Sequence, residues 1–382
     1  MSLVSIVKNN PIIYKTYYYV MSTVVNAIRF FIKTDDHLIL FVSYGGRHFN
    51  DSPKCIYEAM LKDERYKNYT LVWAFIKPES IHIDTPKIKI DSLNYYLTAL
   101  KARCWVTNVA IERGLNFRGK KTFYLHTTHT TLPKLMGYDD IESGSFSLPC
   151  RFKYDCSCAQ SEIEKQMQLS MFGLNESQVI VSGYPKNDIL CNCSNEERKR
   201  IRKKLGIADG KKVILYAPTY RDISFGAMRC PVNFKRWESI LGPNYIVFFR
   251  AHPVVANETK IDPSCSAVFD VSHYPDNMEL MIASDVLISD YSGIFFEYAV
   301  LEKPMFCFAY DYEQYVKVRG LYFDIREELS GGFMNEEELL NYIKEASPRE
   351  YETKLKMFRD KYVSEYGKAT EICLSKIIKE IK

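Results

Sequence analysis

The sequence contains no apolar run long enough to cross a bilayer and no strong excess of one charge. Its 382 residues include 51 Lys and Arg against 47 Asp and Glu, which gives a net charge of +4. This excess is too small to indicate a nucleic-acid partner by itself. The apolar stretch between Lys15 and Arg29 is too short for a spanning helix. No small-residue signal-peptidase site follows that stretch, so secretion is not expected.

Cysteine pairs with the spacing of a zinc knuckle are also missing. The 11 Cys are irregularly spaced, and the closest pairs, Cys156/Cys158 and Cys191/Cys193, enclose one residue instead of the usual two. The sequence has no clear Asp-x-Asp pair either. We therefore expect free thiols in a reducing compartment, and neither a metal site nor another cofactor.

Short apolar runs alternate with helical segments along most of the chain. With 47% apolar and 26% charged residues, the composition is that of a globular protein with room for two domains. This alternation predicts right-handed βαβ units and parallel sheets. The predicted strands lie within residues 38–43, 70–75, 104–107, 121–126, 154–159, 179–182, 212–222, 245–253, 267–271, 286–288 and 305–309, and the closing helices within 336–345 and 349–382.

Two segments have a pattern suited to a membrane surface. Residues 1–33 mix Tyr and Phe with Lys and Arg, which favours a helix lying in the headgroup region of an anionic membrane. The alternative is a helix packed on the protein's own core. Residues 196–206 are strongly basic, but acidic residues first, basic residues last and a final Gly are typical of a solvated helix. Attraction to anionic lipid is the second interpretation of that segment.

Polar side chains follow several predicted strands at their carboxyl ends, where parallel sheets bind ligands. The loop at residues 126–134 holds two His and four Thr. In the second half, three strands end in Thr219 with Arg221, in Arg250 with His252, and in the turn from Ser289 to Gly293. The simpler interpretations are a Thr-rich surface loop, a loop ion pair at Arg221-Asp222 and a rigid turn at His252-Pro253.

The stretch from Ser284 to Tyr298 reads as a strand, a small polar turn and a helix. Such a turn gathers unpaired backbone N–H groups, which attract phosphate together with the helix dipole. A purely structural turn is the alternative, because many parallel α/β units have the same pattern.

Several motifs together resemble the CDP-glycerol glycerophosphotransferase family, the teichoic acid primases and polymerases of bacterial cell walls. The resemblance runs from about Leu38 to Phe323. Its motifs are Ser43-Tyr44-Gly45-Gly46, Asp51-Ser52-Pro53-Lys54, Gly183-Tyr184-Pro185-Lys186-Asn187-Asp188, Leu215-Tyr216-Ala217-Pro218-Thr219-Tyr220-Arg221-Asp222, Arg250-Ala251-His252-Pro253, Ser289-Asp290-Tyr291-Ser292-Gly293, Ala309-Tyr310-Asp311 and Arg319-Gly320-Leu321-Tyr322-Phe323.

One loop departs from the family pattern. The family has Trp-His-Gly-Thr-Pro-Leu-Lys where this chain has Thr128-His129-Thr130-Thr131-Leu132-Pro133-Lys134. The His and the Lys are kept, while the Gly and the Pro-Leu order are not. The acceptor and the shape of this loop therefore stay open.

The resemblance implies an α/β fold of the GT-B kind, with two Rossmann-like domains facing across a cleft. The expected organisation is a membrane-associating segment over residues 1–34, an acceptor domain over 35–190, a CDP-polyol donor domain over 191–348, and closing helices over 349–382.

The implied reaction transfers glycerol phosphate from CDP-glycerol, or the corresponding group from CDP-ribitol, to an acceptor hydroxyl and releases CMP. The acceptor would be a lipid-linked glycan or polyol phosphate in teichoic acid or capsular polymer synthesis. The enzyme would act peripherally at the cytoplasmic face of the cell membrane, with no nucleic-acid partner. The alternatives are a GT-B glycosyltransferase that uses a nucleotide sugar, and an inactive relative that binds lipid or polymer.

The resemblance also assigns roles to individual residues. His129 would be the base, and His252 would bind the donor phosphate and assist the departure of CMP. Asp290 would orient a His or a sugar hydroxyl, or only hold its turn, and Arg250 would contact substrate or support its loop. The other expected substrate-binding residues are Gly45, Lys134, Thr219, Arg221, Ser289, Ser292 and Gly293.

Overall fold

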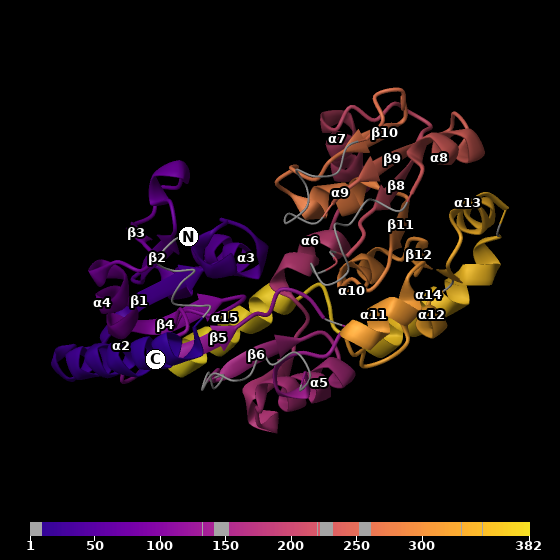
Figure 1. Cartoon of the computed structure of the whole chain (residues 1–382). Helices are drawn as coiled ribbons and strands as arrows, with labels where there is room; N and C mark the ends of the chain where they lie inside the picture. Colours follow the sequence, from indigo (N-terminus) through magenta and orange to yellow (C-terminus); the bar gives the residue numbers. More distant parts are fainter. Residues whose placement is uncertain are drawn as a thin grey trace. The chain divides into compact units, whose positions relative to one another are not determined.

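A computed structural model describes residues 10–131, 133–140, 153–219, 221, 232–251, 261–329, 331–345 and 347–382. The chain forms two compact units (Figure 1). The first unit comprises residues 1–129, 136–188 and 368–382, and the second comprises 130–135 and 189–367. The six-residue segment 130–135 thus belongs to the second unit, although both of its flanks belong to the first.

The first unit is built on a seven-stranded sheet in the order β3-β2-β1-β4-β5-β6-β7, in which neighbouring strands pair in parallel. The run Leu38 to Val42 is buried throughout, because helices cover both faces of a parallel sheet. The strands are β1 (Asp35–Val42), β2 (Thr70–Phe75), β3 (Lys87–Lys89), β4 (Ala102–Thr107), β5 (Phe123–His126), β6 (Cys156–Ala159) and β7 (Val179–Val181).

Capped helices connect these strands. Ser92 and Ser161 accept hydrogen bonds from backbone N–H groups in the first turns of α4 and α5, and Gly173 ends α5 with φ 62°. The helices of the first unit are α2 (Pro11–Phe31), α3 (Asp51–Met60), α4 (Leu93–Lys101), α5 (Glu162–Phe172) and α15 (Ala369–Ile381).

The N-terminal helix α2 packs one face on the first unit. Tyr18 and Val25 are buried, and Ser22 Oγ accepts a hydrogen bond of 2.9 Å from the backbone N–H of Asn116. The opposite side of α2 leaves large apolar side chains exposed. None of the helices in the described ranges is both long and apolar enough to cross a membrane.

The second unit repeats the same plan with a six-stranded sheet in the order β10-β9-β8-β11-β12-β13, again with parallel neighbours. Its strands are β8 (Lys212–Tyr216), β9 (Tyr245–Phe249), β10 (Val268–Asp270), β11 (Val286–Ser289), β12 (Met305–Phe308) and β13 (Gly331–Phe333). Its helices are α6 (Asp188–Cys191), α7 (Asn195–Lys204), α8 (Phe234–Leu241), α9 (Asn277–Ala283), α10 (Ile294–Tyr298), α11 (Tyr312–Val318), α12 (Ile325–Glu328), α13 (Glu336–Glu345) and α14 (Pro348–Tyr362).

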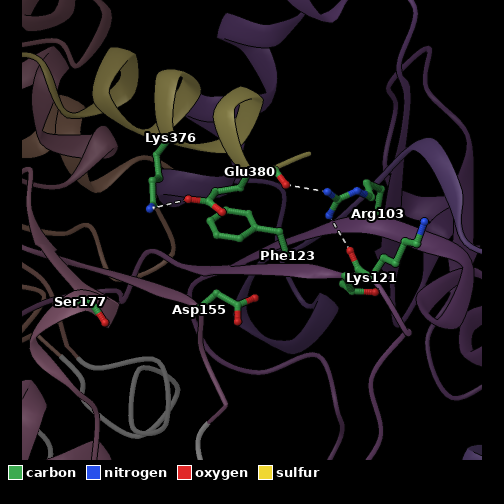
Figure 2. Close-up of a pocket in the computed structure, with 8 residues that line it drawn as sticks. Arg103, Lys121, Phe123, Asp155, Ser177, Lys376 and Glu380 are labelled. Atoms are coloured by element: carbon green, nitrogen blue, oxygen red, sulfur yellow. Dashed lines mark hydrogen bonds and ion pairs between the residues drawn. The ribbon is translucent and has the colours of Figure 1, made fainter. Parts of the chain in front are cut away.

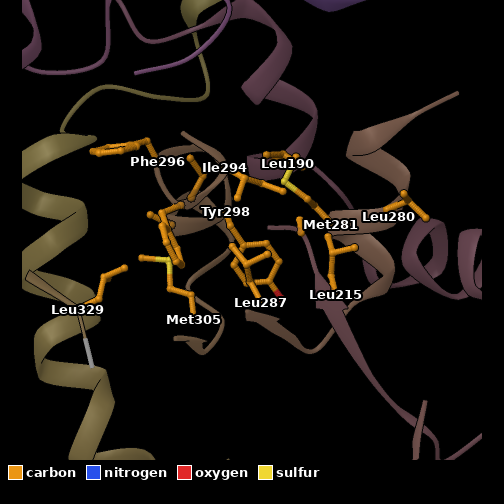
Figure 3. Packing of buried hydrophobic residues seen from close by; sticks show 14 of the residues in the cluster. Leu190, Leu215, Leu280, Met281, Leu287, Ile294, Phe296, Tyr298, Met305 and Leu329 are labelled. Atoms are coloured by element: carbon orange, nitrogen blue, oxygen red, sulfur yellow. The ribbon is translucent and has the colours of Figure 1, made fainter. Parts of the chain in front are cut away.

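One core cluster of the second unit joins its sheet to α9, α10 and α14. Figure 3 shows Leu215 and Leu287 packed among side chains from α9 and α10. Phe296 of α10 contacts Phe358 of α14, with ring centroids 5.1 Å apart. The predicted closing segment 349–382 is thus divided, because α14 packs on the second sheet and α15 on the first.

The basic helix α7 is anchored to the second unit by two of its arginines. Arg198 lies 2.6 Å from one oxygen of Asp285, and Arg202 lies 3.1 Å from the other. These contacts account for part of the positive charge that the sequence concentrates in this segment. The nine cysteines that the structure describes carry free thiols.

Candidate functional site

Both sheets have the strand order that places a ligand crevice where the connections reverse direction. In the first sheet this point lies between β1 and β4. The loop after β1 forms a tight turn at Tyr44-Gly45-Gly46, and the Tyr44 N–H donates a 2.8 Å hydrogen bond to Asn108 Oδ1 after β4. Gly45 has φ 61°, and Arg113 Nη1 would lie 3.1 Å from an added Cβ. Gly45 therefore shapes this turn.

His129 lies in the loop that follows β5 in the first unit. Its ring is half-buried, edge-on to the Tyr44 ring with centroids 5.9 Å apart. Tyr44 in turn contacts the His48 ring at 5.8 Å. Beneath this loop, Lys186 and Asp51 form an ion pair at the same edge of the sheet.

Two polar atoms near this edge have no hydrogen-bond partner among the described residues. They are the Nδ2 of Asn108 and the Oγ1 of Thr128, both on buried side chains. A buried polar group without a partner costs free energy, so such groups commonly mark a place where water or a ligand binds. They lie on the residue after β4 and on the residue before His129.

His126 does not share the environment of His129. It is the last residue of β5 and fully enclosed, stacked on Tyr154 with ring centroids 4.0 Å apart. Its Nδ1 lies 3.2 Å from Ser157 Oγ. Burial lowers the pKa of His126 to about 3, which keeps the ring neutral. The sequence interpretation that placed both histidines in one polar ligand loop is therefore wrong for His126.

In the second sheet the reversal point lies between β8 and β11. Asp290, directly after β11, accepts a 2.8 Å hydrogen bond from the Thr219 N–H in the loop after β8. Ser289 donates a 2.6 Å hydrogen bond to the Ala217 carbonyl oxygen. Thr219 Oγ1 is buried and has no partner among the described residues. Ser292 is half-buried and accepts a hydrogen bond of 3.3 Å from the Ile294 N–H.

Arg221 is held inside this second-unit cluster by two carboxylates. Its Nη2 lies 2.8 Å from Asp290 and its Nε lies 2.6 Å from Asp311, and the side chain is 2% exposed. The guanidinium also lies over the Tyr291 ring, 5.0 Å from its centroid. Burial opposes the charge, but the two carboxylates keep the pKa of Arg221 above its ordinary value. Through these contacts, Arg221 and Asp290 hold the loop after β8 and the loop after β11 together.

Gly293 packs against residues 130–131, which belong to the second unit although both flanks of their segment belong to the first. A Cβ there would overlap Thr130 Oγ1 and lie 2.6 Å from the Thr131 carbonyl oxygen. The space beside the Gly293 Cα is thus occupied by residues 130–131. The helix that follows, α10, has only five residues.

The residues after this contact pair with another motif of the second unit. Lys134 and Leu321 form an antiparallel bridge, and the Leu135 N–H donates a 2.8 Å hydrogen bond to the Gly320 carbonyl oxygen. A Cβ on Gly320 would lie 2.5 Å from Leu135 Cδ1. Lys134 is therefore located by a main-chain pairing with residues 320–322.

A polar pocket of about 380 Å³ opens at the amino-terminal ends of strands in the first sheet (Figure 2). Arg103, Phe123 and Asp155, which line it, stand at the amino-terminal ends of β4, β5 and β6. His129 and Gly45 follow carboxyl-terminal ends of strands. The pocket is therefore separate from the candidate site.

The sequence pattern of the family described as CDP-Glycerol:Poly(glycerophosphate) glycerophosphotransferase matches residues 24–379. The chain belongs to this family. It is 32% identical over 371 residues to the teichoic acid poly(glycerol phosphate) polymerase of Staphylococcus epidermidis, covering 90% of this chain and 51% of that protein. It is 30% identical over 364 residues to the teichoic acid glycerol-phosphate transferase of Staphylococcus aureus, covering 88% of this chain and 92% of that protein.

The chain spans about half the length of two of the poly(glycerol phosphate) polymerases it matches, 51% in one case and 48% in the other. Among solved structures, a histidine-to-asparagine variant of the wall teichoic acid polymerase TagF soaked with CDPG aligns with a TM-score of 0.85. That alignment has 30% identity and covers 94% of this chain and 93% of that one. The expected GT-B-like α/β fold of the glycerophosphotransferase family is thereby confirmed.

Within this family member, most predicted site residues lie at the expected sheet edges of their own units. Arg250 has main-chain partners: its Nη1 donates 2.9 Å hydrogen bonds to the carbonyl oxygens of Val271 and Tyr274. These contacts favour the second of its two expected roles, support of the loop after β9. His252 lies outside the described residues.

Sequence reasoning missed Asp51, Lys186 and Asp311 as parts of these edges. Asp51, the first residue of α3, and Lys186 stand in the sequence only as members of family motifs, without an expected role of their own. The sequence does contain a signal for them, because each of the three residues stands in one of the family motifs.

Proposed function

We propose that the chain transfers glycerol phosphate, or a related polyol phosphate, from a CDP-alcohol to a hydroxyl of a membrane-linked acceptor and releases CMP. The observation that carries this proposal is the family match over residues 24–379. His129, half-buried after β5 at the ligand edge of the first sheet, supplies the base that such a transfer requires. The CDPG-soaked TagF relative supports the class of donor.

His129 takes the proton of the acceptor hydroxyl as the oxygen attacks the phosphorus that bears glycerol. An imidazole ordinarily titrates near neutral pH, which suits a general base. The new P–O bond forms to the acceptor as the P–O bond to CMP breaks, and CMP leaves as the anion. Such transfers depend mainly on positioning and on stabilisation of the charge on the phosphoryl oxygens.

The second unit would bind the CDP-alcohol at the reversal point of its sheet. The buried Thr219 hydroxyl and the half-buried Ser292 are the candidate contacts to the pyrophosphate, supported by the lack of a described partner for Thr219 Oγ1. Arg221 and Asp290 would hold the loops that carry these groups. His252, assigned from the sequence alone, would assist the departure of CMP.

A panel of donors tests this proposal. The full chain is incubated with a lipid-linked polyol phosphate acceptor and with CDP-glycerol, CDP-ribitol or a UDP-sugar, and the released nucleotide is quantified. We expect CMP from at least one CDP-alcohol and no UDP. His129→Ala should reduce CMP release at least about 10²-fold, the lower end of general-base effects. His37→Ala, on the exposed start of β1, is the matched control.

Release of UDP alone would support a nucleotide-sugar glycosyltransferase instead. Absence of any released nucleotide, with the acceptor still bound, would support an inactive relative. Full activity of the His129→Ala variant would refute the assignment of the base but not the reaction.

We further propose that α2 docks on an anionic membrane surface beside the acceptor. Its buried face rests on the first unit, while apolar side chains recur along another face at helical spacing. This exposed stripe consists of Ile13, Tyr17, Val20, Val24 and Phe31. Basic residues at the end of α2 and in the adjoining loop would attract anionic lipid. They include Lys33, Lys120 and Lys121, all exposed.

Vesicle sedimentation tests the docking. Val20→Asp/Val24→Asp should release the protein from vesicles rich in phosphatidylglycerol, because it places two charges on the stripe. Val316→Asp/Val318→Asp makes the same change on the exposed surface of α11 and should leave binding unchanged. Equal binding of both double variants would refute the role of α2, and equal binding to phosphatidylcholine vesicles would refute the role of lipid charge.

A further inference from the structure

Three loops of the first unit, distant in sequence, meet around a buried ion pair. Lys186 Nζ lies 3.1 Å from Asp51 Oδ2, and each side chain is 5% exposed. Lys186 also donates a hydrogen bond to the main-chain carbonyl oxygen of His129. Asp51 Oδ2 accepts a second hydrogen bond, of 2.9 Å, from the Tyr44 hydroxyl. His129 is therefore contacted at its main chain by Lys186 and at its ring by Tyr44, and both of these groups bind Asp51.

Stabilisation of the fold is by itself a weak explanation for a buried ion pair such as Lys186–Asp51. Desolvation of two buried charges commonly cancels their attraction, and a well-packed apolar pair is often as stable. The backbone here is strained as well, since Tyr44, Asp51 and Thr128 have φ values of 46°, 64° and 52°. Each such conformation is unfavourable for a non-glycine residue and persists only where its surroundings fix it, typically at a functional site.

We propose that Lys186 and Asp51 are positioning residues for His129. The ammonium fixes the carbonyl that follows the strained Thr128, and the carboxylate fixes the Tyr44 ring against which the imidazole lies. Together they hold the imidazole in the one orientation that reaches the acceptor proton. This inference rests on the proposed function, because it takes His129 as the base.

The expected kinetic effect follows from the sensitivity of catalysis to position. A misplacement of about 1 Å can cost on the order of 10²-fold in rate. Lys186→Met should therefore lower kcat by roughly 10- to 100-fold. The KM for CDP-glycerol should remain unchanged, because the donor is proposed to bind in the other unit.

A double-variant cycle separates positioning from mere structural support. Lys186→Met leaves the Asp51 carboxylate buried and unpaired, so its Tm should fall. Lys186→Met/Asp51→Asn removes both charges and should recover most of that Tm. The double variant still lacks the hydrogen bond to the His129 carbonyl, so its kcat should stay low. A kcat that recovers together with Tm would overturn the proposal, as would a wild-type kcat in Lys186→Met.

A second measurement does not depend on turnover. In protein labelled with ¹³C at the histidine Cε1, the His129 signal is identified by its loss in His129→Ala. It should shift in Lys186→Met, whereas Lys165→Met, which removes a surface ion pair with Glu176, should leave it in place. An unshifted His129 signal in Lys186→Met would overturn the positioning role. Failure of the wild type to release CMP would instead refute the proposed function while this signal still reports the contact.

Discussion

His126 should make the first unit sensitive to acid, because burial strongly disfavours protonation of its ring in the folded chain. Burial, and to a lesser degree the neighbouring His129, lowers the pKa of His126 from 6.5 to about 3. The unfolded chain therefore binds a proton at a pH where the folded chain does not. The stabilising effect of the neutral ring is complete above about pH 6.5 and is lost as the pH falls toward 3.

The magnitude follows from linkage. With a pKa of 6.5 in the unfolded chain, protonation of that state lowers the free energy of unfolding by about 2 kcal/mol between pH 7 and pH 5. His126→Phe removes the titration and keeps a ring against Tyr154. It loses the contact with Ser157, so its stability should be lower at pH 7, but its further loss on going to pH 5 should be about 2 kcal/mol smaller than that of the wild type.

Urea unfolding at the two pH values checks this difference. Trp73 and Trp105 lie in the core of the first unit, and Trp237 lies in the second. A Trp237→Phe background therefore makes the fluorescence report the first unit. Within that background, His37→Phe is the control, because His37 is exposed at the start of β1 and should retain the wild-type acid response. Equal losses in wild type and His126→Phe would refute the reasoning.

Three further substitutions test the second unit. Gly293→Ala should reduce activity and Tm, because its Cβ would overlap Thr130 Oγ1; unchanged values for both would contradict the close approach. Arg221→Met should cost roughly 3–5 kcal/mol in urea unfolding, because it leaves the Asp290 and Asp311 carboxylates without their shared cation. Phe358→Ala should cost about 3–5 kcal/mol if α14 is part of this unit's core, and a loss below about 1 kcal/mol would place α14 outside it.

The strands of both sheets could be predicted from the sequence because each buried strand is a continuous apolar run. Leu38 to Val42 and Tyr245 to Phe249 are examples, and each lies in the predicted place. The short edge strands β3 and β13 were missed. They contain three residues each, and Lys87–Lys89 and Gly331–Phe333 carry too few apolar residues to be distinguished from loops.

From the sequence, the loops of the candidate site could be predicted, but the contacts of their side chains could not. A residue that follows a parallel strand must lie at the ligand edge, so His129, Thr219 and Ser289 could be placed from the sequence. Which partner each side chain takes depends on loops far away along the chain. Arg221 meets Asp311, 90 residues away, and Lys186 meets Asp51, 135 residues away. No local pattern marks such pairs.

The two sheet edges share one arrangement, and this gives a physical reason for functional groups to gather there. In the first unit Asn108 directly follows β4, and in the second unit Asp290 directly follows β11. Each side chain accepts a 2.8 Å hydrogen bond from a backbone N–H in the loop after the neighbouring strand, which is β1 for Asn108 and β8 for Asp290. One side chain thereby ties together two loops at the candidate ligand edge of its unit. The orphaned atoms, Asn108 Nδ2 and Thr219 Oγ1, belong to these same residue pairs. Buried polar atoms without a partner commonly mark a place where water or a ligand binds, so these two atoms support the proposed binding of a polar ligand at each edge.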